Sequence, residues 1–129
     1  MTYSARRWAA ELEFAREPHS GDLVKLSLVE KSVLRALAEL ENRHEGCAWP
    51  SLKQLMTITG GSRNTVRRGL DRLQELGLIQ VFEKPTPTSS TRYVLHVPER
   101  YRLADDAWSE ANAERARNGR GLQLTHRST

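Results

Sequence analysis

Three arginines and one asparagine lie within one short stretch of this sequence, residues 63–68. The stretch reads Arg-Asn-Thr-Val-Arg-Arg. Arginine donates two parallel hydrogen bonds to guanine, and asparagine pairs in the same way with adenine, so these residue types suit base recognition in a DNA groove. A solvated basic face on an ordinary surface helix is the alternative. We predict base contacts from the polar residues of this stretch: Arg63, Asn64, Thr65, Arg67 and Arg68.

These side chains need a helix to present them. Val66, Leu70, Leu73 and Leu76 recur at three- and four-residue intervals, which predicts a helix over about residues 63–76. Ser62 is a good N-cap for it, and Gly77 is a typical C-terminal stop. With the apolar residues facing inward, cationic and amide side chains take the outer face, and a helix of this kind fits the major groove.

A shorter helix is predicted to precede this one. Ser51 and Gln54 have the spacing of a reciprocal capping box, and Leu52, Leu55 and Met56 follow at helical spacing. Gly60 and Gly61 then supply a turn, because glycine adopts backbone angles that a β-carbon resists. The order helix, turn, helix follows.

Two apolar, β-prone runs come next, at residues 78–82 and 93–97. They predict antiparallel strands around a polar loop, residues 85–91, which is too long for a two-residue hairpin turn. Its hydroxyls and flanking cations suit phosphate oxygens, although an ordinary surface loop explains the loop alone equally well. The predicted phosphate contacts of helices and loop together are Ser51, Lys53, Ser62, Arg72, Lys84, Thr88, Ser90 and Arg92.

This order of motifs resembles the winged-helix domains of phage and plasmid replication proteins and, more distantly, bacterial repressors of the GntR and MarR kind. The resemblance covers residues 27–97 and is sharpest over residues 62–68 and the Leu-Gly-Leu-Ile of residues 76–79. It implies a recognition helix that starts at residues 62–68 and a wing at residues 85–91. Gly61 departs from the pattern, since an apolar residue is common there.

Gly69 is a second departure, because it replaces the alanine usual at this position. A glycine within a helix costs about 1 kcal/mol relative to alanine. We therefore expect that Gly69 either permits close helix packing or makes this helix softer.

A scaffold helix is predicted upstream. Ser27 and Glu30 have capping-box spacing, and an apolar stripe runs toward Gly46. The stripe consists of Leu28, Val29, Val33, Leu34, Leu37 and Leu40. Residues 47–49 are expected to be extended, to pair with the wing strands and to place Trp49 in the core. His44 and Cys47 are two potential ligands where a structural zinc site needs four, so we predict no metal and no cofactor.

Helical stripes also flank this unit. A stripe of Ala5, Trp8, Ala9, Leu12 and Ala15, ended by Pro18, predicts an N-terminal helix, and residues 103–117 predict a C-terminal one. The predicted organisation is a flanking helix in 1–22, the winged unit in 23–98, a flanking helix in 99–117 and a disordered basic tail in 118–129. Helix-turn-helix proteins often read two half-sites as dimers, although packing within one chain is an alternative for these stripes. The predicted dimer contacts are Trp8, Leu12, Leu103 and Trp108.

Charge and composition narrow the function. A net charge of +4 and a pI of 9.6 favour an anionic partner. One cysteine excludes an intramolecular disulfide framework, and no signal peptide or apolar span of membrane length is evident, which predicts a cytoplasmic protein. Zinc-protease helices, phosphate-binding loops and nucleophile elbows have no match, so we expect no enzyme.

The predicted fold class is mainly α with a small β-wing (α+β), a winged helix-turn-helix with extra N- and C-terminal helices. The predicted partner is double-stranded DNA, and the predicted role is a small transcriptional regulator, a repressor, of a bacterium, phage or plasmid. Two alternatives stay open. One is a replication initiator or accessory protein that binds origin repeats, and the other is a protein-interaction module with a basic face.

Overall fold

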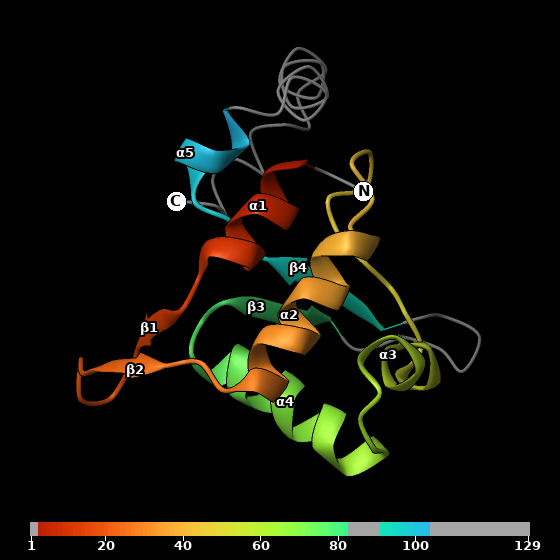
Figure 1. Ribbon diagram of the computed structural model, residues 1–129. Helices are drawn as coiled ribbons and strands as arrows, with labels where there is room; N and C mark the ends of the chain where they lie inside the picture. Colours follow the sequence, from red (N-terminus) through yellow and green to blue (C-terminus); the bar gives the residue numbers. More distant parts are fainter. Residues whose placement is uncertain (1–2, 83–90, 104–129) are drawn as a thin grey trace.

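The computed structural model describes residues 3–82 and 91–103, which contain five helices and four strands (Figure 1). The helices are α1 (Tyr3–Glu11), α2 (Leu28–Leu40), α3 (Leu52–Thr59), α4 (Arg63–Glu75) and α5 (Glu99–Arg102). The strands are β1 (Phe14–Arg16), β2 (Leu23–Lys25), β3 (Ile79–Phe82) and β4 (Arg92–Leu95). Three helices followed by a two-stranded antiparallel sheet confirm the predicted fold class.

Local side-chain caps begin the three helices of the central unit. The hydroxyls of Ser27, Ser51 and Ser62 each accept a hydrogen bond from the backbone N–H three residues on. At Ser27 the Glu30 carboxylate in turn accepts a hydrogen bond from the Ser27 backbone N–H at 3.0 Å, which completes the predicted capping box. At Ser51 only the serine half of the predicted box forms. The helix starts are therefore set by short sequence signals.

Left-handed glycines end the second and third of these helices. Gly60, with φ of 76°, is the C-cap of α3, and Gly77, with φ of 74°, follows the end of α4. Behind Gly77 the Leu78 N–H reaches back to the Leu73 carbonyl at 3.0 Å, the long bond of a Schellman motif. The same explanation is wrong for Gly61, whose φ is not positive. A β-carbon there would lie 3.3 Å from the Val66 side chain, so closeness rather than backbone angle favours glycine.

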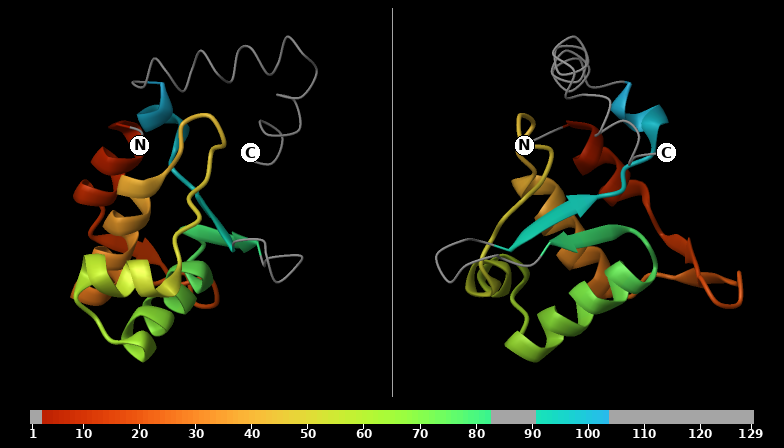
Figure 2. Two further views of the ribbon diagram at one scale, coloured as in Figure 1. Left: turned by 90° about the vertical axis from the view of Figure 1, so that its right-hand side faces the viewer. Right: turned by 180° about the vertical axis from the view of Figure 1, so that it is seen from behind.

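Helix α2 lies at the centre of the core and packs against α1, α3 and α4 (Figures 1 and 2). Fully buried side chains from these helices and from β3 meet around it, among them Leu34, Leu37, Leu55, Leu73 and Ile79. Ala5, Trp8 and Ala9 of α1 belong to the same cluster. The N-terminal helix is thus part of one hydrophobic core with the helix-turn-helix, while α3 and α4 occupy the opposite end of the molecule from α1 and α5 (Figure 2).

Helices α2 and α4 cross closely at Gly69. A β-carbon at this position would lie 3.1 Å from Val33 Cγ2 and 3.2 Å from Val29 Cγ1. Val33 is fully buried and has little room to move. Close helix packing, one of the two expected explanations for Gly69, is therefore confirmed.

Gly69→Val is expected to lower the free energy of unfolding by about 1–3 kcal/mol, because its added carbons overpack this crossing. Urea denaturation measures the change, with Gln74→Val as the control at an exposed position of the same helix. Equal stability of the two variants would contradict a tight crossing.

The β3–β4 sheet pairs Ile79 with Leu95 and Phe82 with Arg92. Ala48 adds a bridge to Tyr93 through backbone hydrogen bonds of 2.7 and 2.9 Å, which confirms the predicted pairing with the wing strands at this residue, whereas Cys47 bridges to Asn42. Most of the predicted wing loop lies in residues 83–90, outside the described residues.

Two expectations about burial are wrong. Trp49 is 40% exposed, because Ala48 and Pro50 on either side of it turn inward. Leu28 is 83% exposed at the first position of α2, so the apolar stripe of this helix begins one residue later. The same helix ends at Leu40, well before Gly46.

The N-terminal segment also differs from the prediction. Helix α1 ends at Glu11, and Ala15 lies in β1, which pairs with β2 around a turn at Gly21, where φ is 75°. Ala15 is buried against Leu26 and Leu76. Its position in the sequence also continues the spacing of the helical stripe, so spacing alone does not distinguish this strand from a longer helix. The predicted single helix is therefore a helix followed by a β-hairpin.

The short helix α5 ties the end of the described chain to its beginning. Arg102 donates to both carboxylate oxygens of Glu41 at 2.7 and 2.8 Å, and to Ser4 at 3.0 Å. The Tyr101 hydroxyl donates to Glu11, and hydrogen bonds from Arg7 and Tyr101 lower the pKa of the Glu11 carboxyl below its usual value. The predicted helix of residues 103–117 and the tail of 118–129 lie outside the described residues, apart from residue 103.

Candidate nucleic-acid interface

The outer face of α4 carries the predicted base-reading residues. Arg63, Asn64, Arg67 and Arg68 are exposed, and Thr65 is partly buried. The opposite face is buried against α2 and α3 through the Val66, Gly69, Leu70 and Leu73 side of the helix. The packing therefore turns the cationic and amide side chains outward together.

The arginines on this face have no competing partner in the described chain. Arg63, Arg67 and Arg68 make no ion pair or side-chain hydrogen bond with another described residue. They lie in the first turns of α4, where the helix dipole adds positive potential. An anionic or hydrogen-bond-accepting surface such as a DNA groove suits this end of the helix.

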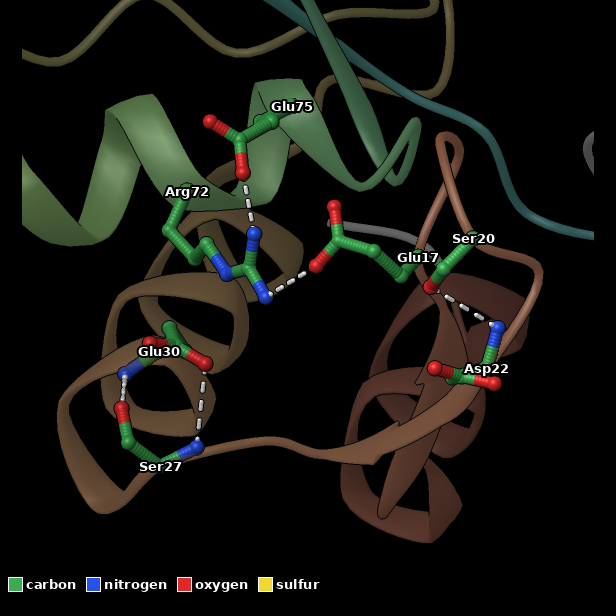
Figure 3. A network of polar contacts seen from close by, with 7 residues as sticks. All are labelled: Glu17, Ser20, Asp22, Ser27, Glu30, Arg72 and Glu75. Carbon is green, nitrogen blue, oxygen red and sulfur yellow. Dashed lines mark hydrogen bonds and ion pairs between the residues drawn. The ribbon is translucent and has the colours of Figure 1, made fainter.

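The C-terminal half of α4 has a different charge. Asp71 and Glu75 are exposed carboxylates, and the Arg72 guanidinium bonds to both Glu75 and Glu17 (Figure 3). The hydrogen bond to Glu17 is the main cause that raises the pKa of Arg72 above its usual value. Positive charge free to meet an anion is thus concentrated in the N-terminal half.

Three of the predicted phosphate contacts, Ser51, Lys53 and Ser62, lie at the N-terminal ends of α3 and α4, whereas Arg72 lies in the last turn of α4. Lys53 is exposed in the first turn of α3. The hydroxyls of Ser51 and Ser62 cap their helices, and Ser62 also donates to the Thr65 hydroxyl at 2.8 Å. Lys53 and the N-terminal ends of α3 and α4 therefore lie at the same end of the molecule. Their contact with phosphate stays a prediction.

Arg92 is held at the root of the wing. Its guanidinium lies over the Trp49 ring, 4.9 Å from the ring centre, and Nη1 donates to Cys47 Sγ at 3.2 Å. Stacking on the Trp49 ring preorganises the Arg92 side chain, and Arg92 is still exposed. Lys84, Thr88 and Ser90 lie outside the described residues.

The three predicted dimer contacts that lie in the described residues do not share one exposed surface. Trp8 is 3% exposed and packs in the core of its own chain, so its assignment to a dimer contact is wrong. Leu12 is partly buried against the two hydrophobic clusters. Leu103 is 69% exposed, and Trp108 lies outside the described residues. Small residues around Trp8 serve close packing of α1 on α2.

Sequence reasoning missed two residues that shape this interface. Nothing in the local sequence signals the exposure of Trp49, because a spacing of two residues from the buried Cys47 predicts an inward side chain. Glu17 pairs with Arg72 across 55 positions of sequence, for which no local spacing gives a signal.

Metal and membrane features are absent from the described ranges. His44 is exposed and Cys47 is a buried free thiol. Residues 3–82 and 91–103 hold no group of three or more His, Cys, Asp or Glu side chains placed to bind a metal ion. None of the helices in those ranges has the length and apolar character needed to cross a membrane.

Comparison with known proteins agrees with this site. Residues 24–79 match the family model described as a helix-turn-helix domain. The matched segment contains α2, α3 and α4 and ends where β3 begins. No curated protein matches the chain. The match and the exposed basic face of α4 together support a DNA-binding helix-turn-helix domain in this part of the chain.

Proposed function

We propose that this protein binds double-stranded DNA in a sequence-specific manner and regulates transcription, as a repressor in a bacterium, phage or plasmid. One observation carries the proposal: the first turns of α4 present three exposed arginines and an asparagine, and the arginines have no partner within the described residues. Arg63, Asn64, Thr65, Arg67 and Arg68 would face base edges in the major groove, where arginine recognises guanine and asparagine recognises adenine. The proposal places the protein in the cytoplasm and includes no catalysis, metal or cofactor.

Phosphate contacts would set the position of the domain on the duplex. Ser51, Lys53 and Ser62 lie at the N-terminal ends of α3 and α4, and Arg92 lies at the root of the wing. Lys84, Thr88 and Ser90 would extend these contacts along the backbone. Such contacts supply affinity and orientation, while the α4 side chains supply sequence preference.

A replication role is the second candidate. It rests on the resemblance of residues 62–68 and 76–79 to winged-helix domains of phage and plasmid replication proteins. The same DNA-binding surface would then mark an origin rather than a promoter.

Capture of sheared bacterial and phage DNA on the immobilised protein, followed by sequencing, separates these functions. Enrichment of promoter sites would support the regulator, and enrichment of origin repeats would support the initiator. No enrichment over a protein-free control would contradict DNA recognition and favour an interaction module with a basic face.

Wing contacts can be tested by the salt dependence of binding. Lys84→Ala and Arg92→Ala should each reduce the magnitude of the slope of log K against log[salt] by about one, because each removes one phosphate contact. Affinity for all sequences should fall similarly. Arg43→Ala is the matched control, since Arg43 is exposed in the turn after α2, at the far end from α4 (Figures 1 and 2). An unchanged slope in both wing variants would show that the wing does not touch the backbone.

We also propose that the protein acts as a homodimer, with Leu103 and Trp108 in the contact. Leu103→Glu should then shift the protein toward monomer in sedimentation at micromolar concentration, because it buries a charge at the interface. Leu23→Glu is the control, since Leu23 is also an exposed leucine but lies on the β1–β2 hairpin. A wild-type chain that sediments as a monomer and binds its site with one protein per duplex would contradict the dimer.

A further inference from the structure

One of the four arginines of α4 is already neutralised within the protein. Arg72 Nη2 lies 2.7 Å from Glu17 Oε2, and Arg72 Nη1 bonds to the Glu75 carboxylate (Figure 3). The other three, Arg63, Arg67 and Arg68, have no carboxylate partner in the described chain. The pairing therefore separates Arg72 from the arginines proposed to read DNA.

The β1–β2 hairpin builds the position of Glu17. The Glu17 N–H donates to the Asp22 carbonyl and the Glu17 carbonyl accepts from the Gly21 N–H, both at 2.8 Å. Arg16 Nη1 donates to the Gly21 carbonyl at 2.8 Å, and the Ser20 hydroxyl accepts from the Asp22 N–H at 3.2 Å (Figure 3). These bonds close the hairpin turn around the residue that carries the carboxylate.

The same hairpin is docked on the end of α4. Ala15 and Leu26 pack with Leu76, the C-cap residue of that helix, and the hairpin lies beside the C-terminal end of α4 (Figure 1). The Arg72 and Glu17 side chains are both partly buried at this contact. The docked β1–β2 hairpin therefore holds Glu17 in place where it bonds to Arg72.

This pairing has a consequence for DNA binding. An arginine at the position of Arg72, two turns along α4, would reach backbone phosphates if it had no carboxylate partner and α4 lay on DNA. Phosphate contacts strengthen binding to every sequence alike. An arginine bonded to two carboxylates contributes no such attraction. Withholding such a contact therefore lowers the affinity for cognate and random DNA alike and makes binding less dependent on salt.

We propose that Glu17 is a positioning residue that acts through Arg72 and limits the sequence-independent affinity of the protein for DNA. It holds the Arg72 guanidinium against the hairpin, away from the DNA backbone, and leaves sequence recognition to the N-terminal half of α4. The inference rests on the proposed DNA-binding function.

The test is a double-mutant cycle on DNA binding, with Glu17→Ala, Arg72→Ala and the double variant. Each is titrated with a selected site and with a random duplex over a range of salt concentrations. Glu17→Ala should increase the magnitude of the log K against log[salt] slope by about one and raise the affinity for the selected and the random duplex alike, several-fold at low salt. The ratio of cognate to random affinity should stay the same, because a phosphate contact strengthens both equally. In the Arg72→Ala background, the Glu17 substitution should add neither change.

Glu13→Ala is the matched control, because Glu13 is an exposed carboxylate that precedes β1 and makes no side-chain bond to another described residue. It removes the same charge without releasing Arg72. Circular dichroism verifies folding, and Glu17→Gln, which preserves the packing, replaces Glu17→Ala if that variant unfolds. An unchanged slope in the Glu17 variant, or an equal change in the Glu13 variant or in the Arg72→Ala background, would overturn the inference. Failure of the wild-type protein to bind any DNA would instead overturn the proposed function.

Discussion

Arg102→Ala is expected to lower the free energy of unfolding by about 3–5 kcal/mol, the usual cost of breaking a buried ion pair from one side. Glu41 is 0% exposed, and Arg102 bonds to both of its oxygens at 2.7 and 2.8 Å. The substitution leaves a buried carboxylate without these two charge-assisted bonds. It also removes the hydrogen bond to Ser4, one of the polar contacts between α5 and α1.

Urea denaturation followed by circular dichroism measures this loss. Arg100→Ala is the matched control, because Arg100 is exposed in the same helix, over the Tyr101 ring. The double variant Glu41→Leu, Arg102→Leu should recover much of the stability, since replacing both charges leaves no buried ion. A single Arg102→Ala variant as stable as Arg100→Ala would show that this pair does not hold α5 on the core.

Arg67→Ala and Asn64→Ala are each expected to cost about 1–3 kcal/mol of binding free energy on a cognate site. Both side chains are exposed in the first turns of α4, and the bonds they make to bases disappear with the side chain. Binding to random DNA should change much less, because it depends on the phosphate backbone.

Gln74→Ala controls for an exposed polar residue near the C-terminal end of the same helix and should leave both affinities nearly unchanged. Fluorescence anisotropy on the cognate and random duplexes at fixed salt gives the two free energies. Equal losses on both duplexes would mean that Arg67 and Asn64 contact phosphates rather than bases.

The central helices were predictable because their limits depend on neighbouring residues. Serine caps at Ser27, Ser51 and Ser62 and left-handed glycines at Gly60 and Gly77 act within one turn of the chain. The spacing of Val66, Leu70 and Leu73 also set which face of α4 is buried. The outward direction of the base-reading candidates follows from that face.

The flanking segments were harder to predict because their structure depends on distant contacts. Ala15 matches a helical stripe by spacing, yet it lies in a strand that packs on Leu76. The Glu17–Arg72 and Glu41–Arg102 pairs join residues 55 and 61 positions apart. A burial pattern along one element cannot specify such partners.

The candidate site residues differ in the same way: some could be predicted from the local sequence, and others depend on distant contacts. Exposure on α4 could be derived from the helix, whereas the pairing of Arg72 with Glu17 and the stacking of Arg92 on Trp49 required the fold. The error at Trp8 has another cause. An aromatic residue on an alanine-rich stripe indicates close helix packing, but it does not show whether the partner helix belongs to the same chain.

Competition binding tests the central claim most directly. The wild-type protein is titrated onto a labelled duplex recovered by its own DNA capture, with unlabelled copies of that duplex or of a random one as competitor at physiological salt. Base recognition by α4 predicts that the selected duplex competes about a thousandfold or more better than the random one. Equal competition by the two duplexes, or no binding to either, would contradict sequence-specific DNA recognition by this protein.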